Sequence, residues 1–227
     1  MAEPSVTLAC RNYDETNALI RRRLGIAGMN LRVDEVNDGP KMFSGMMNGE
    51  YDVSEMSLAE LVYYLTRDRC DFIAIPVFSS RLFRHRFILC NGSTGISGPQ
   101  DLTGTQIGGL RWVQTAFVWL RGMLAEQHGL SPKHTRWYVS ALHHWHGHGA
   151  EDKITHRDGS VIALLTGEGS DEYDMSCRAL LSGNIDVLMT TENRKYDLLA
   201  RDSRVRALFS NPREAEAAAI LFTSSNP

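Results

Sequence analysis

Two arginines and a histidine lie within five positions of this 227-residue chain, at Arg81, Arg84 and His85. They follow the apolar run 72–75, which Pro76 ends. Arginine offers a fixed fork of donors that matches a carboxylate, and histidine can hold or donate a proton near neutral pH. If the apolar run is a buried strand, these side chains lie at its carboxyl end, where anion sites often form. An exposed basic turn solvated by water is the alternative interpretation.

Six further polar residues lie where a predicted strand ends or the next helix begins. They are Arg11, Tyr13, Glu55, Ser57, Gln114 and Thr115. Each also has a purely structural interpretation. Glu55 can complement a helix N-terminus, Ser57 can act only as a helix cap, and Tyr13 can serve only in packing. Gln114 and Thr115 can simply begin their helix.

Composition limits the classes of function. Hydrophobic residues make up 43% of the chain and charged residues 22%, which is typical of a soluble globular protein. The net charge of −3 argues against a nucleic-acid binder that relies on bulk electrostatics. The four cysteines form no CxxC pair, so a zinc ribbon or thioredoxin motif is not predicted. With neither a secretory signal pattern nor a membrane-length apolar run, we expect a cytoplasmic protein.

Strands and helices alternate along the chain. Strands are predicted at 6–10, 31–36, 51–53, 72–75, 87–90, 105–109, 137–139, 161–165 and 185–189. Helices are predicted at 16–24, 42–47, 58–65, 113–126, 175–181 and 213–219. This order predicts an α/β fold with mostly parallel sheets. We expect two lobes with a ligand cleft between them, lobe I from residues 1–92 and 190–227 and lobe II from residues 93–189.

Several runs of residues resemble the 4,5-dihydroxyphthalate decarboxylase family. They are YDVSEMSLAELV at 51–62, FIAIPVFSSRLFRH at 72–85, QDLTGTQIGG at 100–109, QTAFVWLRG at 114–122 and LSGNIDVL at 181–188. The resemblance extends in order from about residue 6 to residue 219. It implies the two-lobed fold of type 2 periplasmic solute-binding proteins. It also implies removal of a carboxylate from a dihydroxylated aromatic diacid, with no metal or organic cofactor.

Decarboxylation of such an acid needs cations for the diacid, a proton donor for the ring carbon and hydrogen-bond partners for the ring hydroxyls. On the resemblance we assign the carboxylates to Arg81 and Arg84 and proton donation to His85. Glu55 is expected to accept from a ring hydroxyl. The other substrate-binding candidates are Ser57, Arg11, Tyr13, Gln114 and Thr115.

The chain departs from the family pattern in two ways. It is shorter, so part of lobe I is expected to be missing, and a partner subunit of a homo-oligomer could cover it. It also carries a histidine-rich insert. The insert contains His143, His144, His146 and His148, which are dense enough for zinc or nickel. A solvated loop is the favoured interpretation of this insert, and no metal site is predicted.

Three functions stay open from the sequence. The first is a lyase that acts on a small hydroxylated aromatic carboxylate. The second is a non-catalytic binding protein of the same fold, and the third is a truncated, inactive relative. None of them predicts a nucleic-acid or membrane partner.

Overall fold

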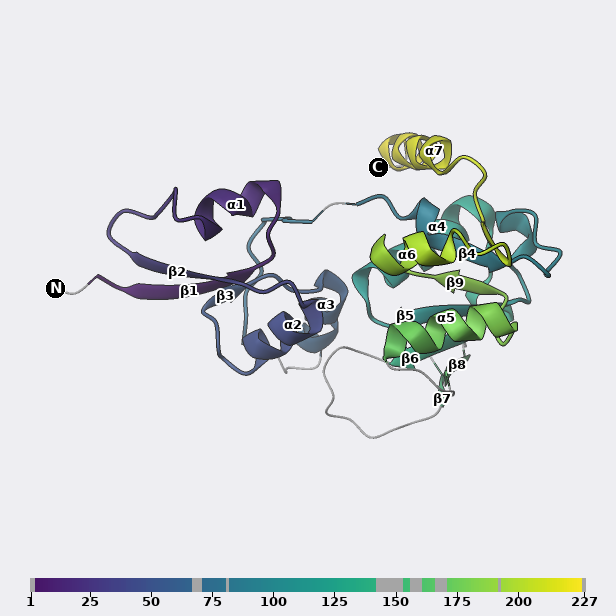
Figure 1. The fold of residues 1–227 in the computed structure, drawn as a ribbon, viewed down its shortest axis with the longest axis horizontal. Helices are drawn as coiled ribbons and strands as arrows, with labels where there is room; N and C mark the ends of the chain where they lie inside the picture. The colour runs from purple at the N-terminus through teal and green to yellow at the C-terminus, as the bar shows by residue number, and fades with distance from the viewer. Residues whose placement is uncertain are drawn as a thin grey trace. The chain divides into compact units, whose positions relative to one another are not determined.

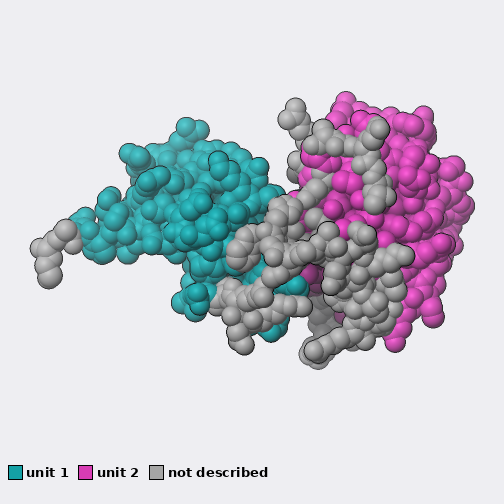
Figure 2. All heavy atoms as spheres, turned by 90° about the horizontal axis from the view of Figure 1, so that it is seen from below, with its two compact units in different colours: residues 1–82, 144–147 teal, residues 83–143, 148–227 magenta. Residues whose placement is uncertain are grey.

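The computed structural model describes residues 3–66, 71–80, 82–141, 153–155, 161–165, 171–191 and 193–225. These residues form two compact units, which Figure 2 shows in different colours. Unit 1 ends at Leu82, and unit 2 begins at Phe83. No helix in the described ranges is long and apolar enough to cross a membrane.

Unit 1 is a three-stranded parallel sheet with helices on both sides (Figure 1). Its strands are β1 (Ser5–Cys10), β2 (Asn30–Glu35) and β3 (Val53–Ser54), in the order β2-β1-β3. Its helices are α1 (Asp14–Ile20), α2 (Gly39–Met47) and α3 (Leu58–Leu65). Because β1 and β3 are parallel, the residues that follow them leave the sheet at the same edge.

Unit 2 is built on a seven-stranded sheet in the order β10-β4-β9-β5-β6-β8-β7. The strands are β4 (Ile88–Asn91), β5 (Gln106–Arg111), β6 (Arg136–Ala141), β7 (Lys153–Thr155), β8 (Val161–Leu164), β9 (Val187–Met189) and β10 (Val205–Ala207). The central strands β9, β5, β6 and β8 are parallel, and β4, β7 and β10 pair antiparallel with their neighbours. The residues before β4 therefore lie at the edge where β5 and β9 end.

The helices of unit 2 cover the two faces of this sheet. They are α4 (Thr115–His128), α5 (Glu172–Ser182), α6 (Asn193–Leu199) and α7 (Pro212–Ser225), with short 3₁₀ turns η1 (His85–Phe87), η2 (Pro99–Asp101) and η3 (Pro132–His134). The strands alternate their side chains between the faces. Ile88 packs in one core cluster with Phe117 of α4, and Leu89 packs in a second with Leu180 of α5.

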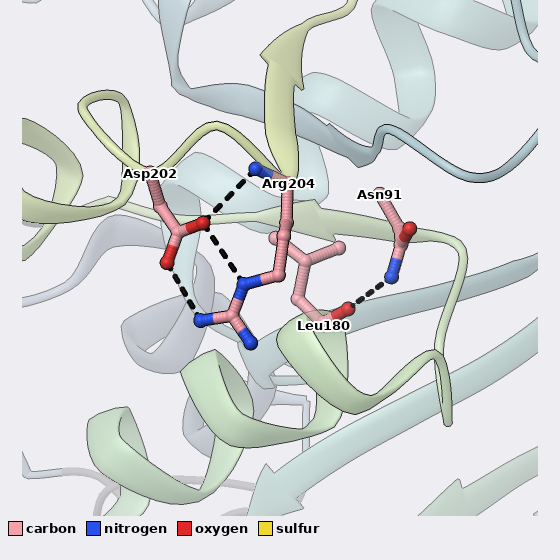
Figure 3. Close-up of polar contacts among 4 residues, drawn as sticks. All are labelled: Asn91, Leu180, Asp202 and Arg204. Carbon is pink, nitrogen blue, oxygen red and sulfur yellow. Dashed lines mark hydrogen bonds and ion pairs between the residues drawn. The ribbon is translucent and has the colours of Figure 1, made fainter.

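The opposite edge of the unit 2 sheet is held by two polar contacts, drawn in Figure 3. At the end of β4, the Asn91 amide donates to the Leu180 carbonyl at 2.7 Å, which joins the strand to α5. Just before β10, Arg204 and Asp202 form a bidentate ion pair with contacts of 3.0 and 2.7 Å. Arg204 lowers the pKa of Asp202 to about 2.

The predicted strand at 72–75 is wrong. Residues 71–80 have no regular secondary structure, and Ile73 is 90% exposed. A short apolar run becomes a strand only when a neighbouring strand pairs with it, and no described strand pairs with this one. Arg84 and His85 are consequently placed by η1 and the start of unit 2, not by a strand that precedes them.

The boundary between the units also differs from the expected lobes. Residues 83–92 and 193–225 were expected in lobe I, but they lie in unit 2. The reason is strand pairing, since β10 pairs with β4 and β4 pairs with β9. Within unit 1, the helix predicted at 16–24 is α1, which begins at Asp14 and ends at Ile20, with Tyr13 as its N-cap residue.

Candidate functional site

Three polar side chains of unit 1 contact one another at the carboxyl ends of β1 and β3. We call Arg11, Tyr13 and Glu55 the unit 1 cluster. The Arg11 guanidinium donates to the Tyr13 hydroxyl at 3.2 Å, and that hydroxyl donates to Glu55 Oε2 at 3.5 Å. Glu55 Oε1 accepts from the Arg11 backbone N–H at 2.7 Å. A cation, a phenol and a carboxylate are thus held together, all partly buried.

Local structure fixes each member of the unit 1 cluster. Arg11 directly follows β1, and Glu55 directly follows β3, where its backbone N–H donates to the Ala9 carbonyl at 3.2 Å. Tyr13 is held by a capping box, in which its backbone N–H donates to Thr16 Oγ1 at 2.9 Å. The strand pairing and the helix start together place the three side chains within reach of one another.

The absence of a side chain at Gly39 leaves room for the Arg11 guanidinium. Gly39 is buried at the first position of α2, and a Cβ there would overlap the Arg11 guanidinium. Only glycine therefore allows the side chain to lie where it does. Nearby, burial raises the pKa of the Cys10 thiol, with smaller contributions from the charges of Glu55 and Glu35. Cys10 is itself buried, at 2% exposed, and packs as a small apolar side chain.

Ser57 lies close in sequence to the unit 1 cluster but has a different setting. It is the N-cap residue of α3 and is buried, at 7% exposed. Glu60 in the first turn of the helix is also buried, at 1% exposed. The predicted cap position is confirmed, while a contact of Ser57 with substrate stays a prediction.

A second polar set lies at the edge of the unit 2 sheet where β5 and β9 end. We call Arg84, Gln114, Tyr173 and Thr191 the unit 2 cluster. Gln114 Nε2 donates to Thr191 Oγ1 at 2.9 Å, and the Tyr173 hydroxyl lies 3.2 Å from the same atom. Arg84 Nη1 donates to the Thr191 carbonyl at 3.3 Å. Thr191 therefore joins side chains that come from three other segments of the chain.

The sheet topology explains this convergence. Gln114 follows β5 as the N-cap residue of α4, and Thr191 follows the parallel strand β9. Arg84 precedes β4, which is antiparallel to β9, so it meets the same edge. The Thr190 N–H donates to the Phe87 carbonyl at 3.0 Å and closes that junction. Thr115, the first residue of α4, lies beside Gln114 in sequence.

His85 takes a different direction from Arg84. Its side chain is buried, at 6% exposed, and its ring lies edge-on to Phe209 with 5.3 Å between centroids. Neither ring nitrogen has a hydrogen-bond partner among the described residues. Burial, and then the charge of His128, lowers the pKa of His85 below its ordinary value of 6.5. The imidazole is therefore neutral at pH 7, and its role as proton donor stays a prediction.

Two of the predicted features lie outside the described residues. They are Arg81 and the histidine insert at 143–148. Within the described ranges, no group of three or more histidine, cysteine, aspartate or glutamate side chains could hold a metal ion. The predicted residues that the structure describes thus fall in two clusters, each within its own unit: Arg11, Tyr13 and Glu55 in unit 1, and Arg84 and Gln114 in unit 2.

A comparison of sequences finds related proteins of known name. The chain is 31% identical over 189 residues to a 4,5-dihydroxyphthalate decarboxylase of Pseudomonas putida, covering 83% of this chain and 71% of that protein. The chain belongs to the 4,5-dihydroxyphthalate decarboxylase family. A decarboxylase of the same name from Comamonas testosteroni is 32% identical over 138 residues, which are 60% of this chain. That match spans only 42% of the Comamonas protein. The relatives' names describe carboxy-lyases, and no family model matches the chain.

Solved structures show the fold. The periplasmic aliphatic sulphonate binding protein SsuA from Escherichia coli matches with a TM-score of 0.53 at 12% identity, covering 99% of this chain and 70% of SsuA. The predicted α/β fold of the type 2 periplasmic-binding-protein kind is confirmed. This decarboxylase-family chain therefore shares its fold with SsuA.

Sequence reasoning missed two members of the unit 2 cluster, Tyr173 and Thr191. Thr191 carried a usable signal, because it is the second residue after the last strand of the parallel group. Tyr173 carried none, since it lies in the first turn of α5 with no distinguishing neighbour. Gly39 was also missed, because its use depends on where the Arg11 side chain lies.

Proposed function

We propose that this protein decarboxylates a hydroxylated aromatic acid of the 4,5-dihydroxyphthalate type. The observation that carries the proposal is the unit 1 cluster, in which a guanidinium, a phenol and a carboxylate are linked by hydrogen bonds. Membership in the decarboxylase family agrees with that chemistry. The cluster offers an anion partner, a proton donor and a proton acceptor, which are what this reaction requires.

Arg11 is the proposed partner of the carboxylates in unit 1. A guanidinium has five N–H donors, and the bond to Tyr13 uses one of them. Arg84 is the proposed cationic partner in unit 2, together with Arg81 as the sequence predicts. Loss of Arg11 or of Arg84 is expected to weaken affinity for the diacid.

Glu55 is the proposed base. It takes the proton of the ring hydroxyl that lies para to the leaving carboxylate, and electron density moves to the ring carbon that bears the carboxylate. The Tyr13 hydroxyl gives that carbon a proton and forms the new C–H bond. The bond to the carboxylate then breaks, carbon dioxide leaves, and its electron pair returns to the ring.

The cycle closes with two proton transfers. Glu55 returns its proton to the phenolate oxygen of the product, a dihydroxybenzoate. Tyr13 takes a proton from solvent, so one proton is consumed for each carbon dioxide released. The Arg11 guanidinium, which donates to the Tyr13 oxygen at 3.2 Å, keeps this hydrogen bond to Tyr13 through the cycle.

We place proton donation on Tyr13 in preference to His85. Tyr13 already donates toward Glu55 and lies beside a cation, whereas the His85 ring is buried against Phe209 and kept neutral. A neutral imidazole is a much weaker acid than the imidazolium that the sequence assignment needs. The two assignments differ in a measurable way, because each predicts a different inactive variant.

The test is direct. Purified protein is mixed with 4,5-dihydroxyphthalate, and carbon dioxide and dihydroxybenzoate are measured by mass spectrometry. Release by the wild type and its loss in Glu55→Gln support the proposal. Calorimetric binding of the diacid without release favours a non-catalytic binding protein, and release that persists in Glu55→Gln removes Glu55 as the base.

A further inference from the structure

The Gln114 side chain uses one end of its amide and leaves the other end without a partner. Nε2 donates to Thr191 Oγ1 at 2.9 Å. The opposite atom, Oε1, is buried from solvent, and no described residue donates to it. An amide oxygen that is shielded from water and lacks a donor costs free energy, so natural proteins rarely keep one without a use.

The orientation of this amide is fixed by the residues around Thr191. The Tyr173 hydroxyl lies 3.2 Å from Thr191 Oγ1, the same atom that accepts from Gln114 Nε2. The Thr191 backbone is held by Arg84, whose Nη1 donates to the carbonyl at 3.3 Å. Thr191 is therefore immobilised through both its side chain and its backbone, and the amide that bonds to it presents Oε1 in a defined direction.

An amide oxygen selects a ligand that carries a hydrogen-bond donor. A carboxylate offers only acceptors, whereas a phenolic hydroxyl offers a donor. We propose that Gln114 Oε1 accepts a hydrogen bond from a ring hydroxyl of the aromatic acid and selects hydroxylated acids over unhydroxylated ones. Thr191 and Tyr173 are positioning residues that hold the amide in this orientation. The inference rests on the proposed function, because it takes an aromatic acid as the ligand.

The expected consequence is a difference between two diacids that differ only in their hydroxyls. 4,5-Dihydroxyphthalate can satisfy Gln114 Oε1, and phthalate leaves it unpaired. A buried group left unpaired in this way lowers affinity by about ten-fold or more. The ratio of the two dissociation constants therefore measures hydroxyl recognition, while any general damage to the site changes both constants together.

The experiment measures both dissociation constants by calorimetry in the wild type, Gln114→Met and the control Gln100→Met. Gln100 is an exposed glutamine in η2 and bonds to Ser97. We expect a ratio of about ten in favour of the hydroxylated diacid in the wild type and in the control. In Gln114→Met the ratio falls to near one, and phthalate binds as in the wild type.

The variant Thr191→Val tests whether Thr191 holds the Gln114 amide in position. It also replaces Gln114→Met as the test of the inference if that variant fails to fold. It removes the hydroxyl while keeping the shape, so the amide loses its anchor and the ratio falls part of the way toward one. Equal binding of the two diacids by the wild type overturns the inference and leaves decarboxylation standing. An equal loss of both affinities in Gln114→Met, with the ratio unchanged, also overturns it, because the amide oxygen then does not distinguish the two diacids. If the wild type binds neither diacid, both the proposed function and this inference fail.

Discussion

The unit 1 cluster and the unit 2 cluster occupy matching places, at the carboxyl ends of parallel strands, but their chemistry differs. In unit 1, charged groups are bonded to an ionisable phenol, Arg11 to Tyr13 and Tyr13 to Glu55. In unit 2, the contacts around Thr191 are mainly those of neutral amides and hydroxyls, with Arg84 bound to a backbone carbonyl. Proton transfer suits the first set, and recognition suits the second.

On the proposed function, the fold divides two tasks between these two positions. A strand end fixes a backbone position, and the residue type placed there decides what the position does. Variants of Tyr13 and Glu55 should therefore lower the rate of chemistry, and a variant that displaces Arg11 should weaken binding. Variants around Thr191 should change which acid binds. The predictions below test these assignments.

The largest effect is expected for Glu55→Gln. Glutamine keeps the shape and can still accept from the Arg11 N–H, but it cannot take a proton. We expect kcat to fall about 1000-fold with little change in KM, because general base catalysis is lost while binding remains. Product formation is measured beside Glu35→Gln, an exposed carboxylate at the end of the neighbouring strand β2. Equal losses in the two variants would contradict the assignment.

Tyr13→Phe should have the next largest effect. It removes the proposed donor and leaves the ring in place, so kcat is expected to fall about 100-fold. The matched control is Tyr51→Phe in the same unit, which should keep full activity. A Tyr13→Phe enzyme with wild-type kcat would return the donor role to His85 or to another acid.

Gly39→Ala should act through Arg11 alone. The new Cβ would overlap the Arg11 guanidinium and displace it from the cluster. We expect KM for the diacid to rise about ten-fold, since a misplaced arginine loses its charge-assisted bonds. Gly25→Ala is the control, because a Cβ at Gly25 meets nothing within 4 Å. A thermal unfolding scan of both variants separates displacement of Arg11 from loss of folding.

Much of this architecture could be predicted from the sequence. Apolar spacing and capping residues identified the helix after Ser57 and the helix after Gln114, and both are confirmed. The α/β fold was predicted in the same way. The strand at 72–75 failed because an apolar run does not state whether a partner strand is available. The compact units divide the chain elsewhere than the expected lobes, because the pairing of β10 with β4 is a long-range contact.

The site was predictable in part. Strand ends singled out Arg11, Glu55 and Gln114, and the structure places each at the carboxyl edge of a parallel sheet. The sequence could not show in which direction each side chain points. Arg84 and His85 are adjacent in sequence, yet one bonds to Thr191 and the other packs against Phe209. Adjacent residues in a 3₁₀ turn point to different sides, and which side is buried depends on elements far along the chain.

The smallest effect on turnover is expected for His85→Phe, and its main consequence is a change in pH dependence. Burial and His128 lower the pKa of His85 in the folded protein, so the unfolded chain binds a proton more readily. Stability contributed by the neutral ring is therefore fully present above the unfolded value of about 6.5 and is lost as pH falls below it. Phenylalanine keeps the contact with Phe209 and cannot be protonated.

Thermal unfolding followed from pH 7.5 to pH 5 measures this linkage. The wild type should lose stability over that range more steeply than His85→Phe, while His134→Phe, at an exposed histidine in η3, should follow the wild type. Turnover by His85→Phe at pH 7 should stay within about three-fold of the wild type, because packing is preserved. A loss of 100-fold or more with binding intact would make His85 the proton donor, and chemistry would then be shared between the two units.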